Sequence, residues 1–130
     1  MRERVAAARV GRLATVRPDG RPHLVPVCFA AIGDEIVTAV DAKPKSTNAL
    51  ARLDNVRAHP DVALLVDHYD DDWNQLWWVR VDGVARVDEM HDRYGDALAA
   101  KYPQYATTRP PGPAIVIAVR RFTGWAPHRL

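Results

Sequence analysis

Short runs of β-branched and other apolar residues, separated by turn residues, recur along this chain and constrain its fold more than any other feature. Six runs are long enough to form strands, and they span residues 11–17, 22–30, 35–40, 62–66, 76–87 and 114–123. Two other segments keep the apolar spacing of an amphipathic helix, at 46–57 and at 90–102. This order predicts a mainly β (α+β) fold, a six-stranded antiparallel barrel with flanking helices.

Turn residues support this division of the chain. Pro18-Asp-Gly-Arg predicts a hairpin between the first two strands. Pro22 and Pro26 predict that the second strand lies at a sheet edge or has an interrupted ladder, because proline lacks a backbone N–H. The proline-rich segment 103–113 is expected to be a loop.

Length, charge and cysteine content limit the possible functions. A chain of 130 residues can bury a real core but is too short for two domains, so we expect one domain over residues 1–130. The net charge of +2 gives no strong case for nucleic acid as a partner. The longest apolar stretch, 24–32, is too short to span a membrane, and the N-terminus does not resemble a signal peptide. Cys28 is the only cysteine, which fits a reduced, cytoplasmic protein.

A basic turn before the first predicted helix is the best candidate for a binding site. Lys43 and Lys45 lie just before Ser46 and Thr47, which are expected at the N-terminus of that helix. Free backbone N–H groups and the positive end of the helix dipole suit an anion there. Pro44 keeps the approach extended. The alternative interpretation is a solvated basic turn with an ordinary helix cap.

The sequence contains no recognisable catalytic constellation. Motifs of hydrolases, nucleotide-binding loops and Cys-x-x-Cys sites are absent. The acidic segment 67–72 around His68 is more typical of a solvated loop than of a cation site, so no metal is expected. Cys28 lies in an apolar run, where packing is the more usual role of a thiol. If the protein is an enzyme, we therefore expect a bound cofactor to supply the chemistry.

The tryptophans favour a planar ligand. Trp77 and Trp78 are adjacent on a predicted strand, so one side chain faces the core and the other faces outward. Trp125 follows the last predicted strand. An outward tryptophan needs a cover, which a partner subunit, a planar ligand or a loop can provide. Core packing is the alternative for each residue alone, but together with the basic turn they indicate a planar ligand that carries a phosphate.

Seven segments keep an order and spacing that are known from one protein superfamily. They are Gly11-Arg-Leu-Ala-Thr-Val, Pro18-Asp-Gly-Arg-Pro-His-Leu-Val-Pro-Val, Lys43-Pro-Lys-Ser-Thr, Leu64-Leu-Val-Asp-His-Tyr, Trp77-Trp-Val-Arg-Val-Asp-Gly, Lys101-Tyr-Pro-Gln-Tyr and Phe122-Thr-Gly-Trp. Over essentially its whole length the chain resembles the pyridoxamine 5'-phosphate oxidase superfamily. The last two segments make it most similar to the branch of PPOX-class F420-dependent oxidoreductases.

The resemblance implies a split β-barrel that forms a homodimer, with two cofactor sites in the grooves between the subunits. The cofactor-binding residues that it implies are Pro26, Val27, Cys28 and Thr38 at the ring, Lys43, Lys45, Ser46 and Thr47 at the phosphate, and Trp77, Trp78 and Trp125 from the partner subunit.

The resemblance also implies an oxidoreductase that transfers a hydride between coenzyme F420, a deazaflavin, and a small organic substrate. The phosphodiester and glutamate tail of F420 would suit a row of cations, for which Lys43, Lys45, Arg52 and Arg57 are candidates. Hydride transfer needs orientation more than an acid–base pair, so no catalytic side chain is assigned. The alternatives are an FMN-binding oxidoreductase on the same fold and a non-catalytic protein that binds F420 or a flavin.

Overall fold

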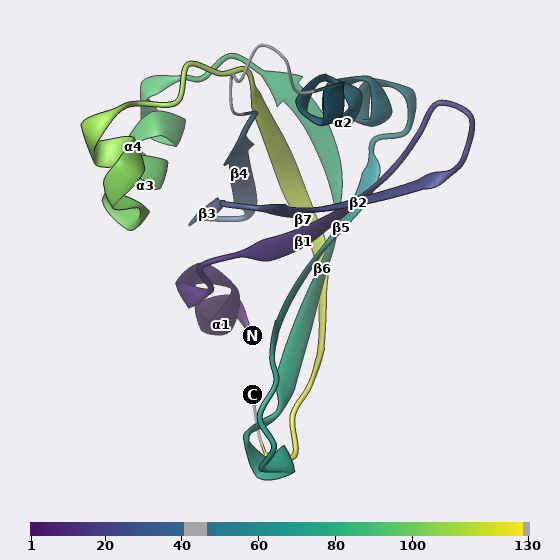
Figure 1. Cartoon of the computed structure of the whole chain (residues 1–130), viewed down its shortest axis with the longest axis vertical. Helices are drawn as coiled ribbons and strands as arrows, with labels where there is room; N and C mark the ends of the chain where they lie inside the picture. The colour runs from purple at the N-terminus through teal and green to yellow at the C-terminus, as the bar shows by residue number, and fades with distance from the viewer. Residues whose placement is uncertain (41–46, 129–130) are drawn as a thin grey trace.

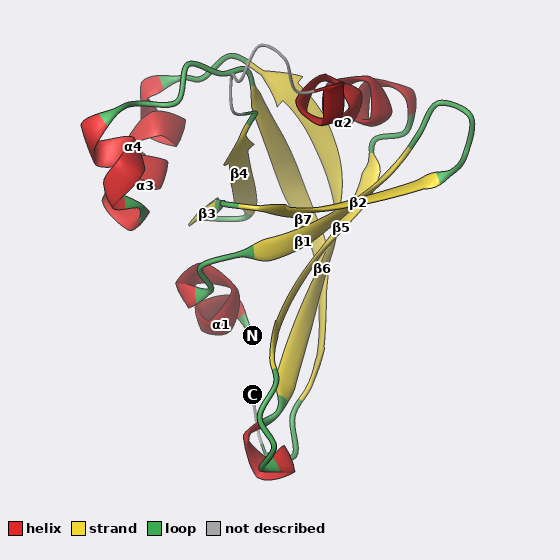
Figure 2. Ribbon diagram, in the orientation of Figure 1, coloured by secondary structure: helices red, strands yellow, loops and turns green. Residues whose placement is uncertain are grey.

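The chain folds into one curled β-sheet with helices around it (Figures 1 and 2). The computed structural model describes residues 1–40 and 47–128, without the side chains of residues 47–49. The helices are α1 (Arg2–Ala7), α2 (Thr47–Ala58), α3 (Asp92–Lys101), α4 (Pro103–Thr107) and the short 3₁₀ helix η1 (Trp73–Gln75). The strands are β1 (Gly11–Val16), β2 (Pro22–Val27), β3 (Ala30–Ile32), β4 (Glu35–Ala39), β5 (Asp61–His68), β6 (Trp77–Asp88) and β7 (Ala114–Trp125).

All the strands pair antiparallel in the order β2-β1-β5-β6-β7-β4-β3. The edge strands β2 and β3 follow each other in the sequence and are separated only by Cys28 and Phe29. The sheet therefore curls until its two edges almost meet, although no ladder joins them in the described part of the chain. The mainly β, α+β class is confirmed. The predicted strand count is wrong, because the structure has seven strands and the sequence predicted six.

The additional strand arises because the predicted second strand breaks at Cys28 and Phe29. The Thr38 hydroxyl donates to the Cys28 carbonyl at 2.7 Å, and the Phe29 N–H donates to the Tyr102 hydroxyl at 3.1 Å. Because side chains satisfy these backbone groups, the ladder can stop without leaving them unpaired. The two hydroxyls come from residues 10 and 73 positions further along the chain, so a local pattern could not reveal the break.

The helices also differ from the prediction. The sequence indicated two helices, and the described residues contain four α-helices and η1. One of the additional helices, α4, lies in the segment 103–113 that was predicted to be a loop. Pro103 occupies its first turn, where the missing N–H costs no helical hydrogen bond. The prediction that Pro22 and Pro26 mark an edge strand is confirmed, because β2 is at the sheet edge.

Two apolar clusters hold the sheet and the helices together. The larger cluster fills the inside of the curled sheet under α2, and its fully buried members include Leu13, Phe29, Leu64, Val79 and Ile117. The smaller cluster packs α3 against β4 and β7, and it includes Tyr94, Leu98 and Val116. Burying each large apolar side chain contributes about 1.5–3 kcal/mol. The β2–β3 junction lies between these clusters, so its backbone is held from both sides.

Figure 1 shows where the remaining parts lie. Helix α2 is at one end of the sheet, the long β5–β6 hairpin extends to the opposite end, and α3 and α4 lie at the side. Within residues 1–40 and 47–128, no helix has the length and apolar character needed to cross a membrane.

Candidate functional site

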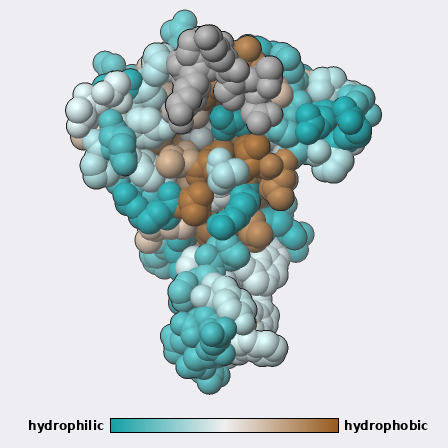
Figure 3. All heavy atoms as spheres, viewed as in Figure 1, coloured by the Kyte–Doolittle hydropathy of each residue, from teal (hydrophilic) through white to brown (hydrophobic). Residues whose placement is uncertain are grey.

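The outer face of β2 and the junction that follows it carry four exposed side chains, Pro22, Leu24, Pro26 and Cys28, and we call the last three the β2 strip. Strand alternation puts these side chains on one face and leaves His23 and Val27 on the buried face. Leu24 is 66% exposed. Figure 3 shows that the face of the molecule seen in Figure 1 has an apolar patch at its centre. An exposed apolar strip of this kind indicates a surface that a ligand or a partner covers.

The predicted ring-wall residues lie together at this strip. Pro26 and Cys28 belong to it, whereas Val27 is only 5% exposed and can offer a ligand only its backbone. Thr38 is 1% exposed, and its hydroxyl donates to the Cys28 carbonyl. In this structure Thr38 therefore supports the wall from behind. Leu24 was missed, although continuing the alternation from Pro26 would have found it.

Tyr102 fixes the β2–β3 junction from the side of α3. Its hydroxyl accepts the Phe29 N–H and lies 2.9 Å from the Arg9 carbonyl and 3.1 Å from the Phe29 carbonyl, to either of which it can donate. Burial raises the pKa of Tyr102, so the hydroxyl keeps the proton that it donates. This role could not be predicted from a local pattern, because Arg9 and Tyr102 are 93 residues apart.

The described residues include only the end of the predicted phosphate-binding segment, at the start of α2. The predicted phosphate-binding residues Lys43, Lys45 and Ser46 lie outside the described residues. Thr47 is the first residue of α2, which confirms the predicted helix start. Helix α2 is 12 residues long and has no acidic residue in its first turn, so no side chain there opposes an anion at its N-terminus.

The two predicted tail-binding arginines lie further along α2. Arg57 is exposed and lies 3.9 Å from the Asp54 carboxylate, a loose surface pair. Arg52 is half-buried.

The three predicted tryptophans lie at the opposite end of the sheet from α2. Trp78 and Trp125 are cross-strand neighbours on β6 and β7, and Trp77 faces His68 across the β5–β6 ladder. Trp125 is 46% exposed, while Trp77 and Trp78 are half-buried. One chain therefore does not bring the tryptophans to the β2 strip.

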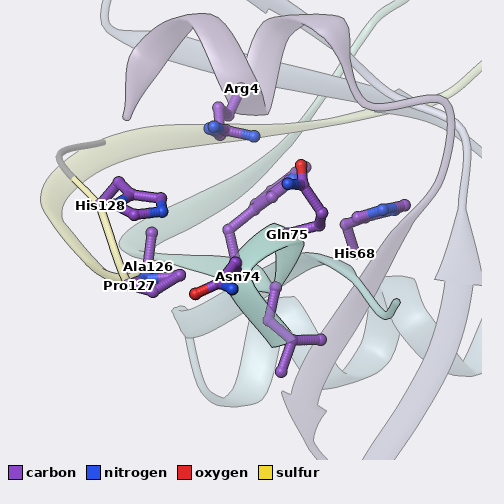
Figure 4. Close-up of a pocket in the computed structure, with 9 residues that line it drawn as sticks. Arg4, His68, Asn74, Gln75, Ala126, Pro127 and His128 are labelled. Carbon is purple, nitrogen blue, oxygen red and sulfur yellow. The ribbon is translucent and has the colours of Figure 1, made fainter. Parts of the chain in front are cut away.

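A cavity of about 390 Å³ lies beside Trp77, between α1, η1 and the C-terminal segment (Figure 4). The Arg4 guanidinium lies 4.7 Å from the centre of the Trp77 ring, and the His68 ring is stacked at 6.4 Å from the same side chain. The other polar residues of the lining are Asn74, Gln75 and His128. Arg4 and His128 come from opposite ends of the chain, so no sequence pattern could place them together.

The acidic segment near this cavity forms ion pairs. Asp67 pairs with Arg12 at 3.1 Å, and the His68 Nε2 atom lies 3.8 Å from the Asp70 carboxylate. Among the residues with described positions, no three His, Cys, Asp or Glu side chains are arranged to hold a metal ion.

A comparison with models of protein families decides the family of this chain. The model for pyridoxamine 5'-phosphate oxidase matches residues 1–126. The chain belongs to the pyridoxamine 5'-phosphate oxidase family. The superfamily resemblance drawn from the seven sequence segments is thereby confirmed. A search among curated proteins gave no match.

Solved structures resemble this family member over most of its length. The conserved hypothetical protein Rv2991 from Mycobacterium tuberculosis superposes with a TM-score of 0.75 and 29% identity, covering 98% of this chain and 87% of that chain. A protein named F420 reductase gives a TM-score of 0.66 and 25% identity, covering 93% and 94%. The FAD-binding protein from Mycobacterium smegmatis gives 0.60 and 21%, covering 92% and 86%, a likeness that shows the fold alone.

Proposed function

We propose that this protein is a coenzyme F420-dependent oxidoreductase that transfers a hydride between the deazaflavin ring and a small organic substrate. The observation that carries the proposal is the exposed, apolar β2 strip on an edge strand of this fold. A flat ring can cover this strip while its phosphate reaches the basic turn before α2. The 25% identity to an F420 reductase over 93% of the chain supports the choice of cofactor.

Each part of the site has a separate role in this proposal. The bound deazaflavin supplies the hydride chemistry. The β2 strip and the Val27 backbone bind and orient the ring, and Thr38 keeps the Cys28 carbonyl in place. Lys45, with the hydroxyls of Ser46 and Thr47, binds the phosphate at the positive end of α2.

The tail beyond the phosphate separates F420 from FMN. The F420 tail continues into carboxylates, and Lys43, Arg52 and Arg57 offer cations for them along the turn and α2. Arg57 is available because its pair with Asp54 is exposed and loose, and such pairs contribute little. Both cofactors carry a tricyclic ring and a phosphate, so the β2 strip and Lys45 cannot distinguish them. An FMN-binding oxidoreductase is therefore the second candidate.

We place the cofactor site in a groove between two copies of the chain. Trp77, Trp78 and Trp125 lie at the end of the sheet away from α2, so they can reach the β2 strip only from a second subunit. Trp125 is also exposed, and a second subunit that packs against it would bury its ring. Light scattering is expected to give twice the mass of 14.5 kDa at micromolar concentration. A concentration-independent monomer mass would exclude the shared groove.

The proposed function is tested by measuring which cofactor the purified protein retains. Purified protein is incubated with F420 or with FMN, freed of unbound cofactor, and examined by absorbance. The Lys45→Ala variant is expected to bind F420 about tenfold to a hundredfold more weakly, because a hydrogen bond to a charged group contributes about 1.5–3 kcal/mol. Arg2→Ala is the matched control, since Arg2 is an exposed cation on α1 that pairs with Asp34 and lies outside the proposed site.

Retention of F420 by the wild type and its loss in Lys45→Ala would support the proposal. If folded protein retains neither cofactor, the proposal is wrong. If F420 is retained but reduced F420 transfers no hydride to any member of a panel of organic acceptors, the protein only binds the cofactor and the enzymatic assignment falls.

A further inference from the structure

A larger cavity, of about 610 Å³, lies between the β2–β3 junction and the helices α3 and α4, and we call it the α4 cavity. The residues of its lining that matter here are Arg9, Cys28, Tyr102, Tyr105, Arg109 and Pro111. Of the described residues that the family resemblance assigns to the cofactor, only Cys28 lines it. The α4 cavity is thus a separate space that meets the cofactor wall at one residue.

One end of the α4 cavity carries positive charge that no carboxylate among the described residues balances. The Arg9 guanidinium donates to the Lys101 carbonyl at 2.8 Å and lies 4.9 Å from the centre of the Tyr102 ring. Both contacts are with uncharged groups, so the full charge of Arg9 remains. Arg109 differs, because it donates to the Asp96 carboxylate at 2.6 Å.

Lys101 places a second cation close to Arg9. Its Nζ atom is buried, has no hydrogen-bond partner among the described residues, and lies 3.9 Å from the centre of the Phe29 ring. Burial, with a contribution from the Arg9 charge, lowers the pKa of Lys101 to about 8, so most molecules still carry this charge at neutral pH. Two neighbouring cations with no anion between them repel each other. A bound anion would remove that repulsion.

The rest of the lining is aromatic and apolar. The Tyr105 ring packs edge-on against Tyr102, with 5.9 Å between the ring centres and 84° between the planes. Pro110 and Pro111 complete this wall. A pocket with charge at one end and flat apolar walls at the other has the general character of a site for a small organic ligand.

We propose that the α4 cavity binds a small organic monocarboxylate with a flat apolar body. The carboxylate faces Arg9, which lines the cavity, and the charge of the buried Lys101 ammonium acts on it from behind the wall; the body packs against Tyr105 and Pro111. Because Cys28 belongs both to this cavity and to the β2 strip, the ligand would lie beside the cofactor ring and would be the substrate; this last step rests on the proposed function. The binding of the anion itself does not require the cofactor.

Ligand binding in the cavity can be followed through the reactivity of Cys28. Cys28 is exposed and is the only cysteine in the chain, so its alkylation reports on the place where this cavity meets the β2 strip. Cofactor-free protein is treated with iodoacetamide, an uncharged reagent, and the rate is followed by intact mass. Benzoate is expected to slow the alkylation. Benzyl alcohol, which has the same ring without the charge, is expected to need at least about ten times the concentration for the same effect.

A pair of arginine variants tests the assigned cation. Arg9→Gln keeps a polar side chain but loses the charge, and it is expected to weaken the protection by benzoate about tenfold. Arg2→Gln is the control, because Arg2 is an exposed cation on α1 that does not line the cavity and pairs with Asp34. The protection in this control is expected to match that of the wild type.

Three results would overturn the inference. They are no protection by benzoate, equal protection by benzoate and benzyl alcohol, and unchanged protection in folded Arg9→Gln. The comparison of the two ligands uses only the wild type, so it decides the matter even if Arg9→Gln does not fold. Retention of F420 without protection by benzoate would reject this inference alone. Protection without retention of F420 or FMN would reject the proposed function alone.

Discussion

Replacing Lys101 by methionine is expected to stabilise the protein and to weaken its binding of anions. The Lys101 ammonium is buried without a hydrogen-bond partner among the described residues, although the rest of the side chain is partly exposed. Methionine has a similar length, and its thioether packs well against an aromatic ring such as that of Phe29. Lys101→Met therefore removes the unpaired charge and keeps most of the packing.

The expected increase in the free energy of unfolding follows from two opposing contributions of the Lys101 ammonium. Lowering the pKa of Lys101 from 10.5 to about 8 corresponds to about 3.4 kcal/mol, at about 1.36 kcal/mol per pH unit. Because part of the side chain is exposed, solvent screening reduces this penalty to about 2 kcal/mol. The ammonium also attracts the rings of Phe29 at 3.9 Å and Tyr102 at 5.4 Å, which returns about 0.5–1 kcal/mol. Lys101→Met should raise the free energy of unfolding by about 1 kcal/mol near neutral pH.

The pH dependence identifies the ammonium as the cause. The unfolded chain keeps the Lys101 proton up to a pKa of 10.5, whereas the folded chain releases it near 8. The free energy of unfolding of the wild type therefore rises between these two values, and this component of the rise is absent from Lys101→Met. Urea unfolding of both proteins at about pH 7 and about pH 9.5 measures the difference. Lower stability of Lys101→Met at neutral pH, or an identical pH dependence in both proteins, would refute this reasoning.

Three further predictions concern buried groups and are checked by urea unfolding. Tyr102→Phe removes the hydroxyl that accepts the Phe29 N–H, so the free energy of unfolding should fall by about 1–3 kcal/mol; no change would show that the junction needs no such support. Gly83→Ala would place a Cβ 2.5 Å from the Ile117 Cγ2 atom, and a fall of about 1–3 kcal/mol is expected, whereas an unchanged midpoint would contradict this crowding. Burial lowers the pKa of His23 below 6.5, so stability should fall as the pH drops below 6.5, and His23→Gln should remove that fall if His23 is its source.

The strands were predictable because their signals are local. β-Branched residues, alternation and the Pro18-Asp-Gly-Arg turn placed β1, β4, β5, β6 and β7 close to their observed bounds. The break between β2 and β3 was not predictable, because it depends on hydroxyls from Thr38 and Tyr102 that reach the backbone only after the sheet has curled. The helix α4 was missed because the prolines of the segment 103–113 are typical of a loop, although Pro103 also suits a first helical turn.

The site was predictable to the extent that its residues are close in the sequence. The start of α2 at Thr47 is confirmed, and strand alternation alone would have added Leu24 to Pro26 and Cys28. The charged end of the α4 cavity could not be predicted, because Arg9 and Lys101 are 92 residues apart and meet only when α3 packs against the sheet. The cavity beside Trp77 joins both ends of the chain and was missed for the same reason.

The most direct test of the proposed function is the ratio of the dissociation constants for FMN and F420, measured by titrating folded, cofactor-free protein at low and at high salt. We expect F420 to bind at least about tenfold more tightly at low salt, because the proposal assigns its tail carboxylates to three cations, Lys43, Arg52 and Arg57. The preference should shrink as salt rises, since exposed contacts are screened over about 8–10 Å. Equal or tighter binding of FMN at low salt would contradict the assignment to F420.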